Sequence, residues 1–189
     1  MRKLRLLVTK ICTRNCVGCC NNDIKPFGTI NIFELLQNIK EGAYTQIMIT
    51  GGEPLLFPDL LLTYLTTLQS AKGEEKQRCG FPALILYASW LPKHLDNDYL
   101  VSIFSQLNGI TFTMHDEDGL KDFKRLNDIL CMMHYKPSSM RLNVFCDVKL
   151  PPITLHGWNV EFIEWIKDCP LPEGEEFLQL DPLWQNQNS

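Results

Sequence analysis

The chain has 189 residues, of which 45% are hydrophobic and 21% are charged. This composition excludes a disordered chain and predicts one globular domain over residues 1–189, with residues 181–189 as a short C-terminal tail. The formal net charge of −4 provides no general basic field, which argues against a long nucleic acid as a partner.

The N-terminus carries basic residues, but the apolar run beside them is short and soon meets a polar, cysteine-rich stretch. This pattern fits neither a signal peptide nor a membrane span, so we expect a cytoplasmic chain. In a reducing compartment, clustered thiols more often hold metal or carry out redox chemistry than form disulfides. The eight cysteines therefore need individual explanations.

The first half of the chain alternates predicted strands and helices. Residues 3–9 are short, apolar and partly alternating, which is typical of a buried strand, and they lead into a cysteine-rich loop. A helix follows over 31–40, with Asn31 as its predicted N-cap. Residues 46–50 form a second predicted strand, which ends at a Gly-Gly-Glu-Pro turn before a leucine-rich helix over 58–71.

The same alternation continues through the second half. Further strands are predicted over 83–88, 109–114, 140–146 and 176–180, and further helices over 96–107, 119–134 and 159–167. Six strands that alternate with five helices predict an α/β fold with right-handed crossovers and a parallel sheet. Periodicity alone leaves open whether the sheet stays open or curls into part of a barrel.

Three cysteines follow the first predicted strand within eight residues, as Cys12-Thr-Arg-Asn-Cys16-Val-Gly-Cys19. Thiolates are the usual ligands of iron–sulfur clusters, and three of them on a cubane leave one iron without a protein ligand. An exogenous chelator could occupy that iron. The alternative is a zinc site, which needs a fourth ligand such as Cys20, a distant cysteine or a histidine.

A second motif, Gly51-Gly52-Glu53-Pro54, follows the second predicted strand and therefore lies at the same edge of the sheet as the cysteines. Glycines allow the backbone to approach a ligand closely, and Glu53 can accept a hydrogen bond from a cationic amino group. The alternative is a plain turn between a strand and a helix.

The Cys-x3-Cys-x2-Cys loop after one strand and the Gly-Gly-Glu-Pro turn after the next together resemble the radical S-adenosylmethionine (SAM) superfamily. The resemblance covers nearly the whole chain and implies a single core domain folded as a partial (β/α)6 parallel barrel. It further implies that Cys12, Cys16 and Cys19 ligate three irons of one 4Fe-4S cluster.

The same resemblance implies SAM as the second cofactor. Its amino and carboxylate groups would chelate the fourth iron, with Gly51, Gly52 and Glu53 positioning the amino group and Pro54 completing the motif. An electron from a donor such as flavodoxin or ferredoxin would cleave SAM into methionine and a 5′-deoxyadenosyl radical, which abstracts hydrogen from a substrate. The implied activity is that of an oxidoreductase or an activase.

Later strand ends offer polar side chains where the family often places SAM contacts. Ser89, His115 and Asn143 can each donate hydrogen bonds, which suits ribose or the methionine carboxylate. For each of them, a loop or capping role is an equal alternative. Arg141 could pair with a carboxylate or lie as a surface charge, and Gln179 could meet adenine.

Two resemblances bear on the substrate. The segment Cys16-Val-Gly-Cys19-Cys20-Asn21 is similar to the cluster loop of anaerobic ribonucleotide reductase activating enzymes, which implies a glycyl radical enzyme docking at the open side of a minimal barrel. Residues 114–119, Met-His-Asp-Glu-Asp-Gly, resemble a loop of members that modify peptides and small molecules. A small molecule, nucleotide or peptide is therefore the alternative substrate. A non-catalytic zinc-binding α/β module is the alternative of another class.

The remaining cysteines predict no auxiliary cluster. Adjacent residues rarely point at the same metal, so we expect Cys20 to be a bystander. The others lack short metal-ligand spacing, and a buried free cysteine commonly acts as a small apolar residue. These are Cys79, Cys131, Cys146 and Cys169.

Overall fold

The structure is a computed structural model, which describes residues 2–14, 16, 19, 25–74, 80–152, 154–155, 157–164, 166 and 170–181. Its strands are β1 (Arg2–Thr9), β2 (Gly28–Ile30), β3 (Tyr44–Gly51), β4 (Ala83–Ala88), β5 (Gly109–Met114), β6 (Ser139–Phe145), β7 (Trp158–Ile163) and β8 (Glu175–Leu180). Its helices are α2 (Ile32–Lys40), the short 3-10 helix η1 (Pro54–Leu56), α3 (Pro58–Glu74), α4 (Asn97–Phe104) and α5 (Gly119–Met132).

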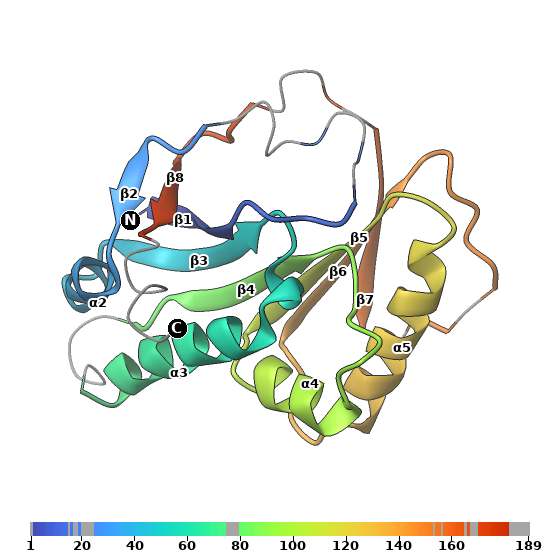
Figure 1. The fold of residues 1–189 in the computed structure, drawn as a ribbon, viewed down its shortest axis with the longest axis horizontal. Helices are drawn as coiled ribbons and strands as arrows, with labels where there is room; N and C mark the ends of the chain where they lie inside the picture. The colour runs from blue at the N-terminus through green and yellow to red at the C-terminus, as the bar shows by residue number, and fades with distance from the viewer. Residues whose placement is uncertain are drawn as a thin grey trace.

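All eight strands belong to one sheet, in the order β2-β8-β1-β3-β4-β5-β6-β7, and every neighbouring pair is parallel. The sheet is curved, with β2 and β7 at its two edges (Figure 1). The α/β class and the parallel partial barrel that the sequence predicted are therefore confirmed. None of the described helices is long and apolar enough to cross a membrane.

The helices begin and end where local chemistry requires it. Asn31 caps α2, since its side chain accepts a hydrogen bond from the backbone N–H of Glu34, and Gly42 follows the helix end at a φ of 70°. Asp96 caps α4 in the same way through the N–H of Tyr99. The start of α2 that the sequence predicted is therefore confirmed.

The two faces of the sheet have different chemistry. Alternate residues of the central strands, such as Leu4, Ile47 and Leu86, are buried in one core with the helices. The residues between them, such as Arg5 and Tyr87, are only half-buried and face the opposite, concave side. The helices lie along the convex side of the sheet (Figure 1). The concave side therefore leaves a surface of mixed polar and apolar side chains open to a ligand.

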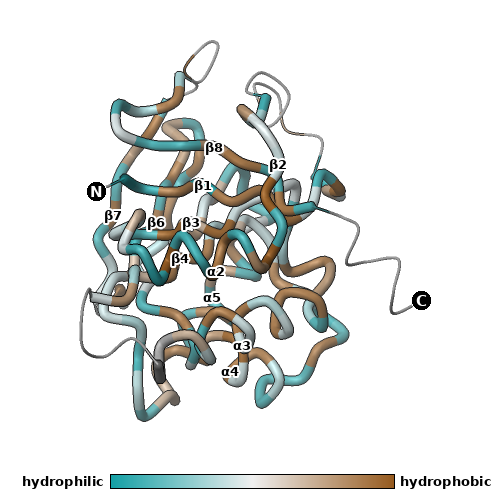
Figure 2. Tube along the Cα trace, turned by 90° about the vertical axis from the view of Figure 1, so that its left-hand side faces the viewer, coloured by the Kyte–Doolittle hydropathy of each residue, from teal (hydrophilic) through white to brown (hydrophobic). Residues whose placement is uncertain are grey.

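Figure 2 shows hydrophobic residues gathered along the strands at the centre of the sheet. Side chains from β5, α5 and β7 extend this core, because the Phe123 ring packs against the rings of Phe112 and Trp158. The core thus lies between the convex face and the helices, and it leaves the concave side for function.

The predicted helix over 159–167 is wrong, because the chain forms strand β7 there and pairs with β6 from Trp158 to Ile163. Trp158 fixes this pairing: its side chain is buried against Phe123, and its Nε1 donates a hydrogen bond to Asn127 Oδ1 at 2.9 Å. The apolar spacing of this short segment fits either type of element, so tertiary pairing decides.

In the part of the chain that the structure describes, the sheet has eight strands rather than the six that were predicted. Besides β7, no sequence pattern indicated β2, which forms at the end of the predicted cysteine-rich loop. This strand has only three residues, and its hydrogen-bonding partner is β8, near the other end of the chain. Such a strand depends on a distant partner and has no periodicity of its own to detect.

We expect Trp158→Ala to lower the free energy of unfolding by about 3 kcal/mol, because it removes a buried ring from the core. Phe162→Ala on the same strand is the matched control, since Phe162 is exposed, and it should change stability by less than about 0.5 kcal/mol. Urea unfolding of both variants measures the difference. Equal losses would contradict the inward orientation of Trp158 on β7.

Candidate functional site

A cavity of about 330 Å³ lies at the carboxyl ends of the strands, on the concave side of the sheet. It is lined by residues from β1, β3, β4, β5, β6 and β7 or from the segments that follow them. The predicted site residues that line it are Cys12, Cys16, Cys19, Gly51, Gly52, Ser89, His115 and Asn143. The folded chain thus brings these residues together, and Glu53 and Pro54 of the Gly-Gly-Glu-Pro motif are buried next to them in the chain.

The cysteine loop is joined to the Gly-Gly turn through the backbone. The N–H of Gly52 donates to the carbonyl of Thr9 at 2.7 Å, and the N–H of Glu53 donates to the carbonyl of Ile11 at 2.9 Å. These bonds continue the pairing of β1 with β3 beyond the strand ends. The close approach of the two segments therefore fixes the backbone position of Ile11 and, with it, the start of the cysteine loop at Cys12.

This approach explains why position 52 is glycine. A Cβ atom at Gly52 would lie 2.1 Å from the carbonyl oxygen of Ile11 and 2.9 Å from the Cβ of Cys12. A Cβ at Gly51 would lie 2.5 Å from the carbonyl oxygen of Thr9. Backbone atoms cannot yield as a flexible side chain can, so a larger residue would displace the cysteine loop.

Glu53 is 1% exposed and lies behind the cavity. Its Oε2 accepts hydrogen bonds from the N–H of Ser89 at 2.8 Å and from Ser89 Oγ at 3.1 Å, while its Oε1 accepts from the N–H of Leu55 at 3.3 Å. Burial raises the pKa of Glu53 to about 7. The carboxyl group thus ties the turn after β3 to the end of β4, and its role toward a bound amino group stays a prediction.

Arg14 is the residue that sequence reasoning missed. It lies within the cysteine motif, and its guanidinium forms an ion pair with Asp116 and donates from Nη1 to the carbonyl of Ser89 at 3.0 Å. Its positive charge also acts to lower the pKa of the Cys16 thiol. An arginine in the motif and an acidic residue after β5 were both visible in the sequence, but their pairing across the fold was not.

His115 and Asn143 present polar atoms from neighbouring strands. The His115 ring stacks on Phe145, with ring centroids 5.0 Å apart. Burial, and then the charge of Arg14, lower the pKa of His115 to about 4, so the imidazole is neutral at pH 7. Asn143 Oδ1 is buried, and it has no hydrogen-bond partner among the residues that the structure describes. A ligand donor in the cavity would satisfy this oxygen.

The three thiols line one cavity, where Cys12 is exposed and Cys16 and Cys19 are half-buried. Burial raises the pKa of the Cys12 and Cys16 thiols, and the Arg14 guanidinium opposes this effect on Cys16. Within the described part of the chain, no three cysteine, histidine or acidic side chains come close enough to hold one metal ion together. Metal binding would deprotonate the thiols, because the thiolate is the ligand.

Other predicted residues lie outside the cavity lining. Arg141 Nε lies 3.4 Å from Glu161 Oε1 on β7, and both side chains are half-exposed. Arg141 is therefore both a surface charge and the partner of a carboxylate. Gln179 pairs with Leu7 across β8 and β1. Cys131 and Cys146 are exposed, so the expectation that they act as buried apolar residues is wrong. Cys20, Cys79 and Cys169 lie outside the described residues.

Comparison with known proteins assigns the chain to no family. No protein-family model matches the sequence, and no curated protein matches it. The fold and the geometry of the cavity therefore carry the functional assignment.

We expect Gly52→Ala to destabilise the protein by about 2 to 3 kcal/mol, because the new Cβ overlaps the backbone of the cysteine loop. Gly80→Ala is the matched control, since a Cβ there would meet nothing within 4 Å and should change stability by less than about 0.5 kcal/mol. Urea unfolding gives the stabilities, and faster modification of Cys12 by a thiol reagent reports the displaced loop. Two variants of equal stability and thiol reactivity would contradict the close approach.

We expect His115 to stabilise the fold less as the pH falls. Its folded-state pKa of about 4 lies below the ordinary value of 6.5, so the unfolded chain binds the proton more tightly between these values. The stability difference between the wild type and His115→Gln should therefore shrink from pH 6.5 to pH 4. Taking this difference removes the contribution of Glu53, which titrates in an overlapping range. A pH-independent difference would show that His115 is not buried in its neutral form.

Proposed function

We propose that this chain is a radical SAM enzyme, with one 4Fe-4S cluster on Cys12, Cys16 and Cys19. The observation that supports the proposal is their convergence: the three cysteines and the Gly51-Gly52 turn, which are separate motifs in the sequence, line one cavity at the carboxyl edge of a parallel partial barrel. Ligand sites of parallel α/β folds gather at this edge.

The residues of the cavity fit such cofactors. Three thiols can bind three irons and leave a fourth iron for an exogenous chelator. The buried Oδ1 of Asn143 offers an acceptor that still needs a donor from a ligand. The volume of about 330 Å³ lies at the lower end of the range for small-molecule sites. When bound, the cluster and SAM supply a 5′-deoxyadenosyl radical that can abstract hydrogen from a substrate.

The residues of the chain itself bind the cofactors, orient them and shield them from water. Cys12, Cys16 and Cys19 hold the metal centre, and the Gly51-Gly52 backbone keeps their loop in place. Ser89 is already committed, since its hydroxyl donates to Glu53 and its carbonyl accepts from Arg14, so it shapes the cavity rather than reaching for a ligand. Asn143 is the better-placed of the two to orient a bound group.

An apolar wall faces these polar groups. Phe145 and Ile163 come from adjacent positions on β6 and β7, and Ile166 follows them at the cavity edge. Apolar side chains at one side of the cavity limit the access of water, which protects a reactive radical from side reactions. The polar and apolar sides together resemble the mixed lining of a small-molecule site.

A protein is the substrate that we favour, because the cluster loop is similar to that of anaerobic ribonucleotide reductase activating enzymes, which implies a glycyl radical enzyme. Ile11, next to the first cysteine, is 60% exposed, and Ile166, which lines the cavity, is 66% exposed. A docked protein would cover both side chains. The alternative is a small molecule, nucleotide or peptide that enters along the concave face, and an external electron donor serves either reaction.

The test is anaerobic reconstitution with iron and sulfide, followed by assay of 5′-deoxyadenosine formation with SAM and a strong reductant. The wild type should bind about four irons and cleave SAM. Cys16→Ala should lose both properties, whereas Cys131→Ala should keep them, since Cys131 is an exposed residue of α5 outside the cavity lining. Stoichiometric zinc without SAM cleavage would establish a zinc-binding module and contradict the proposal.

A further inference from the structure

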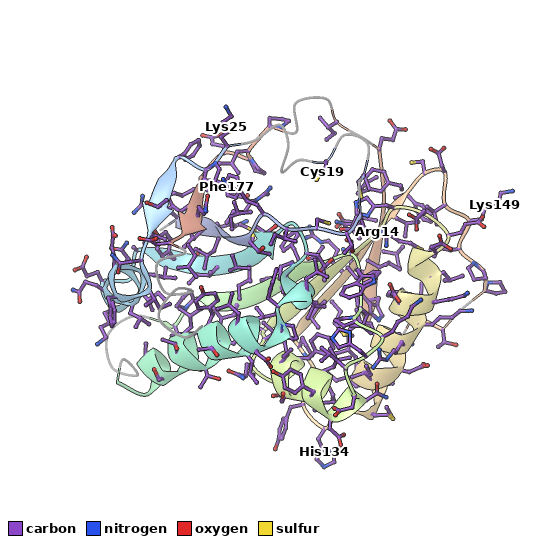
Figure 3. The ribbon with its side chains drawn as sticks, viewed as in Figure 1. Arg14, Cys19, Lys25, His134, Lys149 and Phe177 are labelled. Atoms are coloured by element: carbon purple, nitrogen blue, oxygen red, sulfur yellow. The ribbon has the colours of Figure 1, made fainter. Side chains whose placement is uncertain are left out.

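Arg14 connects the cysteine loop to two other segments of the barrel. Its guanidinium bonds the carbonyl of Ser89 after β4 and the carboxylate of Asp116 after β5, while its backbone lies in the cysteine loop between Cys12 and Cys16. Its side chain is only 13% exposed, so this charge is largely removed from water and needs both of these partners. Figure 3 shows Arg14 and Cys19 at the same end of the molecule, where both line the cavity.

The partners of Arg14 are themselves held in place. Asp116 Oδ1 accepts a hydrogen bond from the N–H of Gly119 at 3.0 Å, at the start of α5, while Asp116 Oδ2 faces Arg14. The N–H of Ser89 donates to Glu53, and the N–H of Glu53 donates to the carbonyl of Ile11. A ring of hydrogen bonds therefore runs from Ile11 through Glu53 and Ser89 to Arg14. The ring is closed by the backbone of the cysteine loop, which joins Arg14 to Ile11.

This ring of hydrogen bonds requires the guanidinium of an arginine, and another cationic side chain would not replace it. A guanidinium presents five N–H donors in a rigid plane and can bond a carbonyl and a carboxylate at once. A lysine ammonium is a point charge on a flexible stem, and it would hold fewer of these partners in fixed directions. The first anchor of the loop is the backbone bonding at Gly52 and Glu53, and the Arg14 side chain is a second, on the far side of Cys12.

We infer that Arg14 is a positioning residue, which holds the cysteine loop against Ser89 and Asp116 so that Cys16 faces the cavity before any metal binds. The functional reason for this anchoring rests on the proposed function, because a metal centre is what the loop would hold. The anchoring itself depends only on the contacts of the protein. Polar partners behind metal ligands typically change metal affinity by about 10- to 100-fold when they are removed.

The test compares Arg14→Gln, Arg14→Lys and Asp116→Asn with the wild type. Asparagine at position 116 can still accept from Gly119 but loses the ion pair, so this variant keeps the start of α5 and isolates the contact. Arg125→Gln is the matched control, because Arg125 also ties a loop through several hydrogen bonds but lies outside the cavity lining.

The first readout is hydrogen exchange without metal, in peptides that contain Cys12 and Cys16. Exchange should be faster in all three test variants and unchanged in Arg125→Gln. The second readout is the rate at which a thiol reagent modifies Cys16 in the anaerobic apoprotein, followed by mass spectrometry of its peptide. Arg14→Gln should be modified faster than the wild type, and Arg14→Gln/Asp116→Asn little faster still, because both changes remove one interaction.

Unchanged exchange and unchanged Cys16 modification in Arg14→Gln would overturn the inference, even if the wild type cleaves SAM. Faster exchange in the test variants would support the anchoring, even if the wild type failed to assemble a cluster; in that case the proposed function alone would fall. If Arg14→Gln does not fold, Asp116→Asn and Arg14→Lys give the same comparison, and wild-type behaviour in both would overturn the inference.

Discussion

The functional geometry depends on the backbone contact between the cysteine loop and the Gly51-Gly52 turn. Two hydrogen bonds extend the pairing of β1 and β3 past the ends of the strands, and the approach is close enough to exclude a Cβ at either glycine. The loop therefore leaves β1 directly over the cavity. Glu53 and Arg14 then fix the loop from opposite sides, through Ser89 at the end of β4.

A second constraint is the unequal chemistry of the two faces of the sheet. Parallel sheets are usually covered by helices on both faces, and their strands are then apolar throughout. Here the convex face packs on the helices, whereas alternate residues such as Arg5, Thr50 and Asn143 line a cavity on the other side. The curvature of the sheet brings these polar groups together with apolar side chains such as Phe145 and Ile163 in one cavity.

Much of this arrangement follows from local sequence patterns. The strands at 83–88 and 109–114 and the Asn31 cap were predicted at the positions where they occur, because alternation and capping are local properties. The placement of both motifs at one sheet edge followed from the strand order. The β7 strand was missed because its short apolar segment takes its form from pairing with β6. The partnership of Arg14 with Asp116 joins segments far apart in the chain, and no local pattern encodes it.

The most direct test of the central claim is electron paramagnetic resonance of the anaerobically reconstituted and reduced chain, recorded with and without SAM. The account predicts the spectrum of a reduced 4Fe-4S cluster, and it predicts that SAM changes this spectrum because three cysteines leave one iron open to it. The spectrum should be absent from Cys16→Ala. A wild-type protein without a cluster signal, or with a signal that SAM leaves unchanged, would contradict the account.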